Sequence, residues 1–199
     1  MSMAKYIDDM IIAALRESVR TKELNQVTVA ELVRMTGINR KTFYNHFTGI
    51  SDLVCSIFHA GFEEIVVGKA EPYTWDVVIK DLLHTAKRNE AFVRKVLESK
   101  YAAQVRQCIQ QDLNRAVMDY VRKVKELMEK TSGDALPMAR RQERYLVRFY
   151  SVLMFAMIEE WVADGMEESV DEYVDIINRL TNKGVDGGIL FFSKSNETE

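Results

Sequence analysis

A single glycine, Gly37, lies between two short segments with helical patterns, and it constrains the fold more than any other feature. Residues 28–31 read Thr-Val-Ala-Glu, a capping box in which the threonine hydroxyl accepts from the backbone of Glu31 and the glutamate carboxylate reaches back. A short helix is therefore predicted over residues 29–35. Glycine enters left-handed backbone cheaply, so we expect the chain to reverse at Gly37 and Asn39 to cap the next helix.

A helix, a short turn with glycine and a second helix together form the spacing of a helix-turn-helix motif. Residues on a helix recur about every 100°, which places Phe43 and Phe47 on one face with the turn residue Ile38. The remaining arc presents the polar side chains Lys41, Thr42, Tyr44 and Asn45, with Arg40 and His46 at its edges. Cations in a first turn oppose the helix dipole. The pattern therefore predicts a surface that meets a polyanion.

Composition favours helices, because the 199 residues include only nine glycines and two prolines. The net charge is −3, so any basic footprint must be local. Cys55 and Cys108 have no metal-ligand or redox spacing and are expected to be reduced, packed thiols. The chain starts without a signal-peptide pattern, and its most apolar stretch, residues 145–158, is too short for a membrane span. A cytoplasmic location without membrane contact is expected.

The sequence predicts an all-α fold with a three-helix, helix-turn-helix head and a larger C-terminal helical bundle. We expect the head at residues 1–52, an effector-binding and dimerisation domain at 53–185, and an irregular tail at 186–199. Pro72 marks the clearest linker, in the segment 68–75. Helical patterns follow at about 75–87, 90–99, 103–130 and 138–164. A second capping box, Ser169 to Glu172, opens the last helix.

The segment 138–164 is apolar nearly all round in its middle, so it must be covered on two sides. One side can pack within its own domain, and the other is expected to meet a second copy of the chain. We therefore predict a homodimer in which residues 144–164 and 169–181 pair into a four-helix arrangement. The predicted interface residues are Tyr145, Phe149, Val152, Phe155, Ile158, Trp161, Tyr173, Ile177 and Leu180.

Residues 28–53, TVAELVRMTGINRKTFYNHFTGISDL, closely resemble the DNA-binding head of the TetR family of bacterial transcription regulators. The matching residues, at the family's spacing and without gaps, are Thr28, Leu32, Gly37, Ile38, Thr42, Phe43, Tyr44, Phe47 and Leu53. The pattern Trp161, Gly165, Glu168-Ser169 and Glu172 is similar to the C-terminal subgroup that includes regulators of dihydroxyacetone kinase. The resemblance implies a double-stranded DNA partner.

The resemblance also implies roles for the head's side chains. Thr28 and Tyr44 would touch phosphates, and His46 would lie at the margin of the major groove. The groove-facing set would be Arg40, Lys41, Thr42 and Asn45, and the cap residue Asn39 is also expected among the DNA-binding residues. These residue types suit base edges, since Arg or Lys pairs with guanine, Asn with adenine and Thr with the thymine methyl.

Ile50 departs from the family, which commonly has a lysine at the start of the fourth helix. We expect this position to face the sugar-phosphate backbone, so that one phosphate contact is missing. The alternative is that Ile50 packs against Phe47 or Val54 in the core of the head.

A soft, mostly apolar set could line an effector pocket or be plain core: His84, Tyr101, Met118, Phe149, Met154 and Met157. Neither His59 nor His84 has acidic or cysteine partners at ligand spacing, so no metal site is expected. No nucleophile motif, glycine-rich phosphate loop or metal triad is present in the sequence. We therefore expect neither an enzyme nor a cofactor.

The expected function is that of a homodimeric transcription regulator on a pseudo-palindromic operator, with half-sites in successive major grooves. A small-molecule or protein effector would shift the population of DNA-binding conformations. One alternative is an adaptor that binds another protein, which a strictly non-apolar cavity would favour. Another is a helical enzyme, which a strongly perturbed acid-base pair in a cleft would favour.

Overall fold

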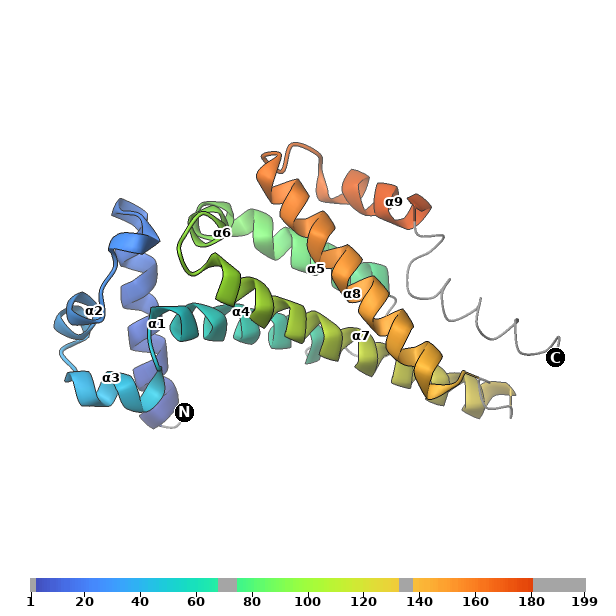
Figure 1. Cartoon of the computed structure of the whole chain (residues 1–199), viewed down its shortest axis with the longest axis horizontal. Helices are drawn as coiled ribbons and strands as arrows, with labels where there is room; N and C mark the ends of the chain where they lie inside the picture. The colour runs from blue at the N-terminus through green and yellow to red at the C-terminus, as the bar shows by residue number, and fades with distance from the viewer. Residues whose placement is uncertain (1–2, 68–74, 133–137, 181–199) are drawn as a thin grey trace. The chain divides into compact units, whose positions relative to one another are not determined.

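The computed structural model describes residues 3–67, 75–132 and 138–180, and within these ranges the chain forms helices and no strand (Figure 1). The first helices are α1 (Met3–Thr21), the 3-10 helix η1 (Leu24–Gln26), α2 (Val29–Thr36), α3 (Arg40–His46) and α4 (Ile50–Val67). They are followed by α5 (Trp75–Arg88), α6 (Glu90–Leu97), α7 (Ala102–Ser132), α8 (Arg140–Ala163) and α9 (Val170–Leu180). The predicted all-α class is confirmed. No helix in these ranges is both long and apolar enough to cross a membrane.

The described residues separate into two compact units. The first unit is drawn from Met1–Gly61 and Arg88–Ile109, and the second from Phe62–Lys87 and Gln110–Glu199. The division departs from chain order because α6 and the first turns of α7 pack with α1–α4. The predicted boundary between residues 52 and 53 stays a prediction. The predicted linker around Pro72 and the predicted tail, 186–199, lie outside the described residues.

The core of the first unit is built from the apolar faces of its helices. Ile11 and Leu15 of α1 are fully buried, as are Leu32 of α2, Phe43 of α3 and Leu53 of α4. The buried side chains Val96 of α6 and Val105 of α7 belong to the same cluster. Each side chain of this size contributes roughly 1.5–3 kcal/mol on burial, so the cluster fixes which face of each short helix points outward.

The end of α1 is held by a lysine from α6. Lys95 Nζ donates to the backbone carbonyls of Val19 at 2.8 Å and Lys22 at 3.0 Å. Carbonyls at a helix C-terminus lack partners within the helix, and a nearby cation satisfies them. Cys55 and Cys108, which also belong to this unit, are not joined in a disulfide and are half-buried.

The turn between α2 and α3 has the predicted backbone. Thr28 Oγ1 accepts from the backbone N–H of Glu31 at 3.2 Å, Gly37 has φ of +72°, and Asn39 Oδ1 accepts from the N–H of Thr42 at 2.8 Å. The reciprocal half of the capping box is wrong. The carboxylate of Glu31 instead accepts from Lys22 Nζ at 2.5 Å and from Ser18 Oγ at 3.2 Å. The hydrogen bond from Lys22 lowers the pKa of this carboxyl.

The second unit is organised around the end of α8. Trp161 stacks on Tyr173 of α9 with ring centroids 5.6 Å apart, and Tyr173 Oη donates to the carbonyl of Met157 at 2.7 Å. The capping box of α9 is confirmed in both directions, with Ser169 N to Glu172 Oε2 at 3.1 Å and Glu172 N to Ser169 Oγ at 3.2 Å.

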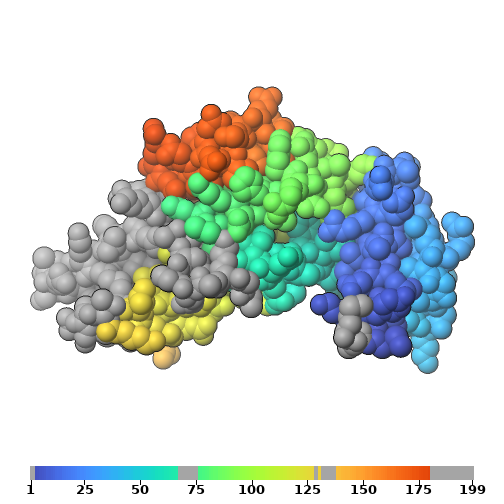
Figure 2. Space-filling view, turned by 180° about the vertical axis from the view of Figure 1, so that it is seen from behind, coloured from blue at the N-terminus to red at the C-terminus, as the bar shows by residue number. Residues whose placement is uncertain are grey.

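The surfaces of α5 and α9 lie side by side in the space-filling view, where they are green and orange-red (Figure 2). Lys80 Nζ of α5 is 2.7 Å from Asp171 Oδ1 of α9. This ion pair is solvent-exposed, so it contributes little stability compared with the aromatic stack.

Candidate functional site

The orientation of α3 is set by its two phenylalanines. Phe43 and Phe47 are buried, with ring centroids 6.0 Å apart, and Tyr44 meets the edge of Phe43 at 5.4 Å. Because this face points into the core, the opposite arc of the helix points to solvent. Exposed side chains on or beside this arc are those of Arg40, Lys41, Tyr44 and Asn45. The predicted separation of buried aromatics from a presented polar surface is confirmed.

The start of α3 carries two cations, Arg40 and Lys41. Neither Arg40 nor Lys41 forms an ion pair with a carboxylate of the described residues. The first turn of α3 also contains no acidic residue. This arrangement opposes the helix dipole, but it leaves two cations ready to meet phosphates or guanine edges.

The predicted base-reading role of Thr42 is restricted by its cap. Its hydroxyl donates to Asn39 Oδ1 at 3.1 Å, and the same oxygen accepts the backbone N–H of Thr42. The Thr42 hydroxyl and the side-chain oxygen Oδ1 of Asn39 are therefore both engaged within the chain. The methyl group of Thr42 remains for a contact with a base. Thr28, the cap of α2, is exposed, and its phosphate contact stays a prediction.

His46 has a partner that the sequence did not reveal. Its Nδ1 lies 2.7 Å from Asp8 Oδ1 of α1, and its side chain is only 16% exposed. The pairing joins residues 38 positions apart and ties the end of α3 to α1. The only available signal was that Asp8 falls on the polar face of the first helix. The contact of His46 with DNA stays a prediction, while its positioning of α3 follows from the geometry.

Ile50 does not face outward. It is the first residue of α4, is 6% exposed and belongs to the buried cluster that contains Phe47 and Val54. The expectation that this position faces the DNA backbone is wrong, and the alternative of core packing is confirmed. The physical reason is that Ile50 starts the same buried stripe that Leu53, Val54 and Ile57 continue along α4.

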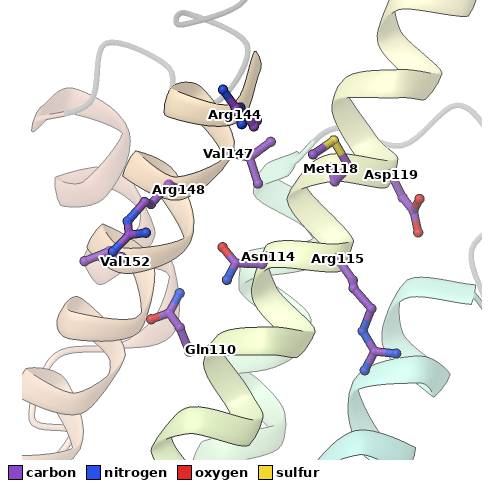
Figure 3. A pocket seen from close by; sticks show the side chains of 9 residues that line it. All are labelled: Gln110, Asn114, Arg115, Met118, Asp119, Arg144, Val147, Arg148 and Val152. Atoms are coloured by element: carbon purple, nitrogen blue, oxygen red, sulfur yellow. The ribbon is translucent and has the colours of Figure 1, made fainter. Parts of the chain in front are cut away.

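A cavity of about 690 Å³ lies between α7 and α8 in the second unit (Figure 3). Its lining is Gln110, Asn114, Arg115, Met118, Asp119, Arg144, Val147, Arg148 and Val152. Of the predicted pocket residues, only Met118 lines it. His84 and Phe149 are exposed, Met154 is buried, Met157 is half-buried, and Tyr101 packs on the core of the first unit.

The chemistry of this cavity is more polar than predicted. Arg144 and Arg148 lie four residues apart on α8, and Gln110 and Asn114 occupy the facing stretch of α7. The sequence signal was faint, because it amounted to Arg148 inside an otherwise apolar stretch. Neither Arg144 nor Arg148 indicates a cavity from the sequence alone, because the faces that α7 and α8 turn toward each other depend on the packing of the whole unit.

The residues of the predicted dimer interface differ in their exposure. Trp161 is 1% exposed, and Tyr173 and Ile177 are also buried inside the unit. Tyr145, Phe149 and Val152 are exposed at helical spacing on α8, with Phe149 at 62%. Phe155 and Ile158 are half-buried, and the side chain of Leu180 lies outside the described part. An exposed apolar stripe therefore exists on α8, while the dimer itself stays a prediction.

Comparisons with known proteins agree with these features. A family model described as the transcriptional regulator C-terminal region, of the TetR type, matches residues 73–183, more than half of the chain. The HTH-type dhaKLM operon transcriptional activator DhaS of Lactococcus lactis subsp. lactis (strain IL1403) is 26% identical over 87 residues. That match spans 44% of this chain and 46% of the relative, which is less than half of either.

Solved structures show the same fold. The dihydroxyacetone kinase operon activator DhaS superposes with a TM-score of 0.63 at 18% identity, covering 89% of this chain and 95% of that one. A TetR transcriptional regulator from Rhodococcus sp. RHA1 superposes with a TM-score of 0.55 at 17% identity, covering 87% and 93%. These likenesses show the fold alone. The family match over residues 73–183 shows that the chain belongs to the TetR family of transcription regulators.

Proposed function

We propose that this regulator binds operator DNA sequence-specifically through α3, as a homodimer on a pseudo-palindromic site, and that an effector bound in the second unit controls it. The observation that carries the proposal is the outward arc of α3. It combines two cations without carboxylate partners in the described residues, Arg40 and Lys41, with an exposed amide, Asn45. Phe43 and Phe47 hold this arc in a fixed orientation from below.

Each side chain on the arc has a role that its chemistry supports. Arg40 and Lys41 can donate to guanine O6 and N7 or to phosphates, and Asn45 can pair bidentately with adenine. Tyr44 is exposed at its ring and can donate its hydroxyl to a phosphate. The contacts made by α3 would therefore combine positioning on the backbone with the reading of bases.

The homodimer is supported by the exposed apolar stripe on α8. Tyr145, Phe149 and Val152 form a surface that a monomer would leave in water. Phe149 is the sharpest test position because its side chain is 62% exposed in the single chain. Phe149→Asp should therefore convert the dimer to a folded monomer in light scattering. A wild-type chain that is monomeric and soluble at micromolar concentration would contradict this assembly.

Selection from random duplex DNA tests the main proposal. The wild-type protein should enrich a pseudo-palindromic site, and Asn45→Ala should relax preference at one position in each half-site, costing roughly 1–3 kcal/mol per half-site. Arg20→Ala is the matched control, because Arg20 is exposed on α1 and pairs with Glu17 at 3.3 Å. It should leave the selected sequence unchanged. Recovery of no common sequence by the wild-type protein would overturn sequence-specific binding.

The adaptor alternative receives no support from the cavity. A strictly non-apolar cavity would have favoured it, but Met118, Val147 and Val152 contribute apolar surface to the lining. A cavity with both apolar and polar walls is the usual form of a small-molecule site. We therefore keep a small-molecule effector in the proposal.

A further inference from the structure

We propose that the cavity between α7 and α8 binds an organic anion, with Arg144 and Arg148 holding its carboxylate or phosphate group. We further assign this anion the role of the effector, a step that rests on the proposed regulator function. Three features of the described lining carry the inference: cations without partners, side-chain amide donors and an apolar wall.

The cations come from α8. Arg144 and Arg148 are four residues apart, so both project from one face of the helix. Neither is in an ion pair with any carboxylate in the described ranges. Guanidinium groups present parallel N–H donors that match a carboxylate or phosphate bidentately. An anion between these two side chains would receive charge-assisted hydrogen bonds from both.

The other charges of the lining are already engaged. Arg115 pairs with Asp112, and Asp119 accepts from Arg122 at 2.9 Å. Figure 3 shows Arg115 and Asp119 directed away from α8, on the far side of α7. The carboxylate of Asp119 is therefore neutralised by a neighbour and turned from the two arginines. The part of the cavity that faces α8 keeps a positive charge.

Amide donors face these arginines from α7. The Nε2 atom of Gln110 is buried and has no hydrogen-bond partner. Asn114 Oδ1 accepts from the fully buried hydroxyl of Ser151 at 2.5 Å, which fixes the amide and leaves Nδ2 as a donor. A buried donor without an acceptor is unfavourable, so the amide of Gln110 is available to donate to an oxygen of a bound ligand.

The size and the apolar wall define the rest of the ligand. A cavity of about 690 Å³ far exceeds an inorganic ion and lies in the range of organic ligands. Met118, Val147 and Val152 provide the apolar surface. The ligand class is therefore an amphiphilic molecule with one anionic group and an apolar body.

Calorimetric titration with three ten-carbon probes tests this assignment. Decanoate and decyl phosphate carry the two anionic groups, and decanol has the same apolar body without charge. The anions should bind more tightly than decanol, and the stronger of the two identifies the preferred group. The double variant Arg144→Gln/Arg148→Gln should bind the preferred anion roughly 10–100-fold more weakly, the range expected for charge-assisted hydrogen bonds.

Arg140→Gln is the matched control for charge, since Arg140 is exposed on α8 and outside the lining. It should bind as the wild-type chain does. Asn114→Asp is a second, nearly isosteric variant for the case in which the double variant fails to fold. It keeps an acceptor for Ser151 but places a carboxylate in the wall, so anion affinity should fall about tenfold or more while decanol affinity stays constant. Equal binding of decanol and the anions, or unchanged anion affinity in Asn114→Asp, would overturn the inference.

Operator binding by the same proteins separates this inference from the proposed function. If random-DNA selection succeeds but no anion binds, the cavity inference fails and the regulator proposal stands. If an anion binds through the arginines but selection yields no site, the regulator proposal fails. The anion site then stands, and only its role as the effector site is lost. With both intact, the preferred anion should change operator affinity in the wild-type chain at a concentration that leaves Asn114→Asp unaffected.

Discussion

Replacing Ile50 tests whether the start of α4 belongs to the core or to a DNA-facing surface. Its side chain is 6% exposed and lies in the buried cluster with Phe47 and Val54. Ile50→Ala removes buried carbon atoms and leaves a cavity, which costs roughly 2–5 kcal/mol. For chains of this size, 1 kcal/mol corresponds to about 2–4 °C in melting temperature, so we expect a fall of about 4–20 °C.

Ile50→Lys should destabilise the chain at least as much as alanine does. The lysine loses the same apolar contacts, and its ammonium must either enter the core or pull its stem out of it. Ile50→Val should cost only about 0.5–1.5 kcal/mol, because it removes a single buried methylene. The three variants therefore form a graded series, which thermal unfolding followed by circular dichroism would measure.

Ser51→Lys is the control for adding a lysine to the first turn of α4. Ser51 is half-buried and does not belong to the core cluster, so this variant should unfold close to the wild-type temperature. The core placement would be refuted if Ile50→Lys kept the wild-type melting temperature. It would be refuted more decisively if that variant also steepened the salt dependence of DNA binding by about 0.9 per head, the value of one added phosphate contact.

Three further changes have defined outcomes in unfolding experiments. Thr28→Ala removes the cap of α2 and should cost about 1 kcal/mol. In Gly37→Ala the alanine must adopt φ near +72°, which should cost roughly 1–2 kcal/mol even though its Cβ would meet no atom within 4 Å. Gly49→Ala is the control, since that site is equally open but has no left-handed φ, so it should cost less. Burial raises the pKa of Tyr173 to about 12, so its contribution to stability should be fully present below about pH 10 and be lost as pH rises to about 12. Tyr173→Phe should make the fall smaller than in the wild-type chain, which urea unfolding across that range would measure.

The parts of the fold that the sequence predicts are those whose causes are local. Gly37, Asn39 and the Ser169–Glu172 box each act on backbone groups within about four residues, so their spacing alone predicts the turn and the caps. The spacing of Phe43 and Phe47 likewise predicts which face of α3 is buried. These features together position the candidate DNA-binding surface. Because their causes are local, the sequence alone predicts them.

Features that depend on distant partners were not predictable. The carboxylate of Glu31 does not accept from the backbone of Thr28, because Lys22 offers a charge-assisted hydrogen bond instead. His46 pairs with Asp8 of α1. Analogy with a lysine in related heads predicts that Ile50 faces DNA, whereas its own apolar side chain completes a buried stripe in the core. Predicting the cavity requires knowing which faces of α7 and α8 meet, and hydrophobic periodicity does not give that information.

The helix α7 contributes residues to both units, which bears on the effector proposal. It is continuous from Ala102 to Ser132, and its first turns belong to the first unit, where Val105 is fully buried. Gln110 and Asn114, which line the cavity, follow on the same helix within three turns. A ligand changes DNA affinity only if it binds one of two arrangements more tightly. Control from this cavity therefore requires that Gln110 and Asn114 meet the anion in one placement of α7 and not in another, with the packing around Val105 differing between the two.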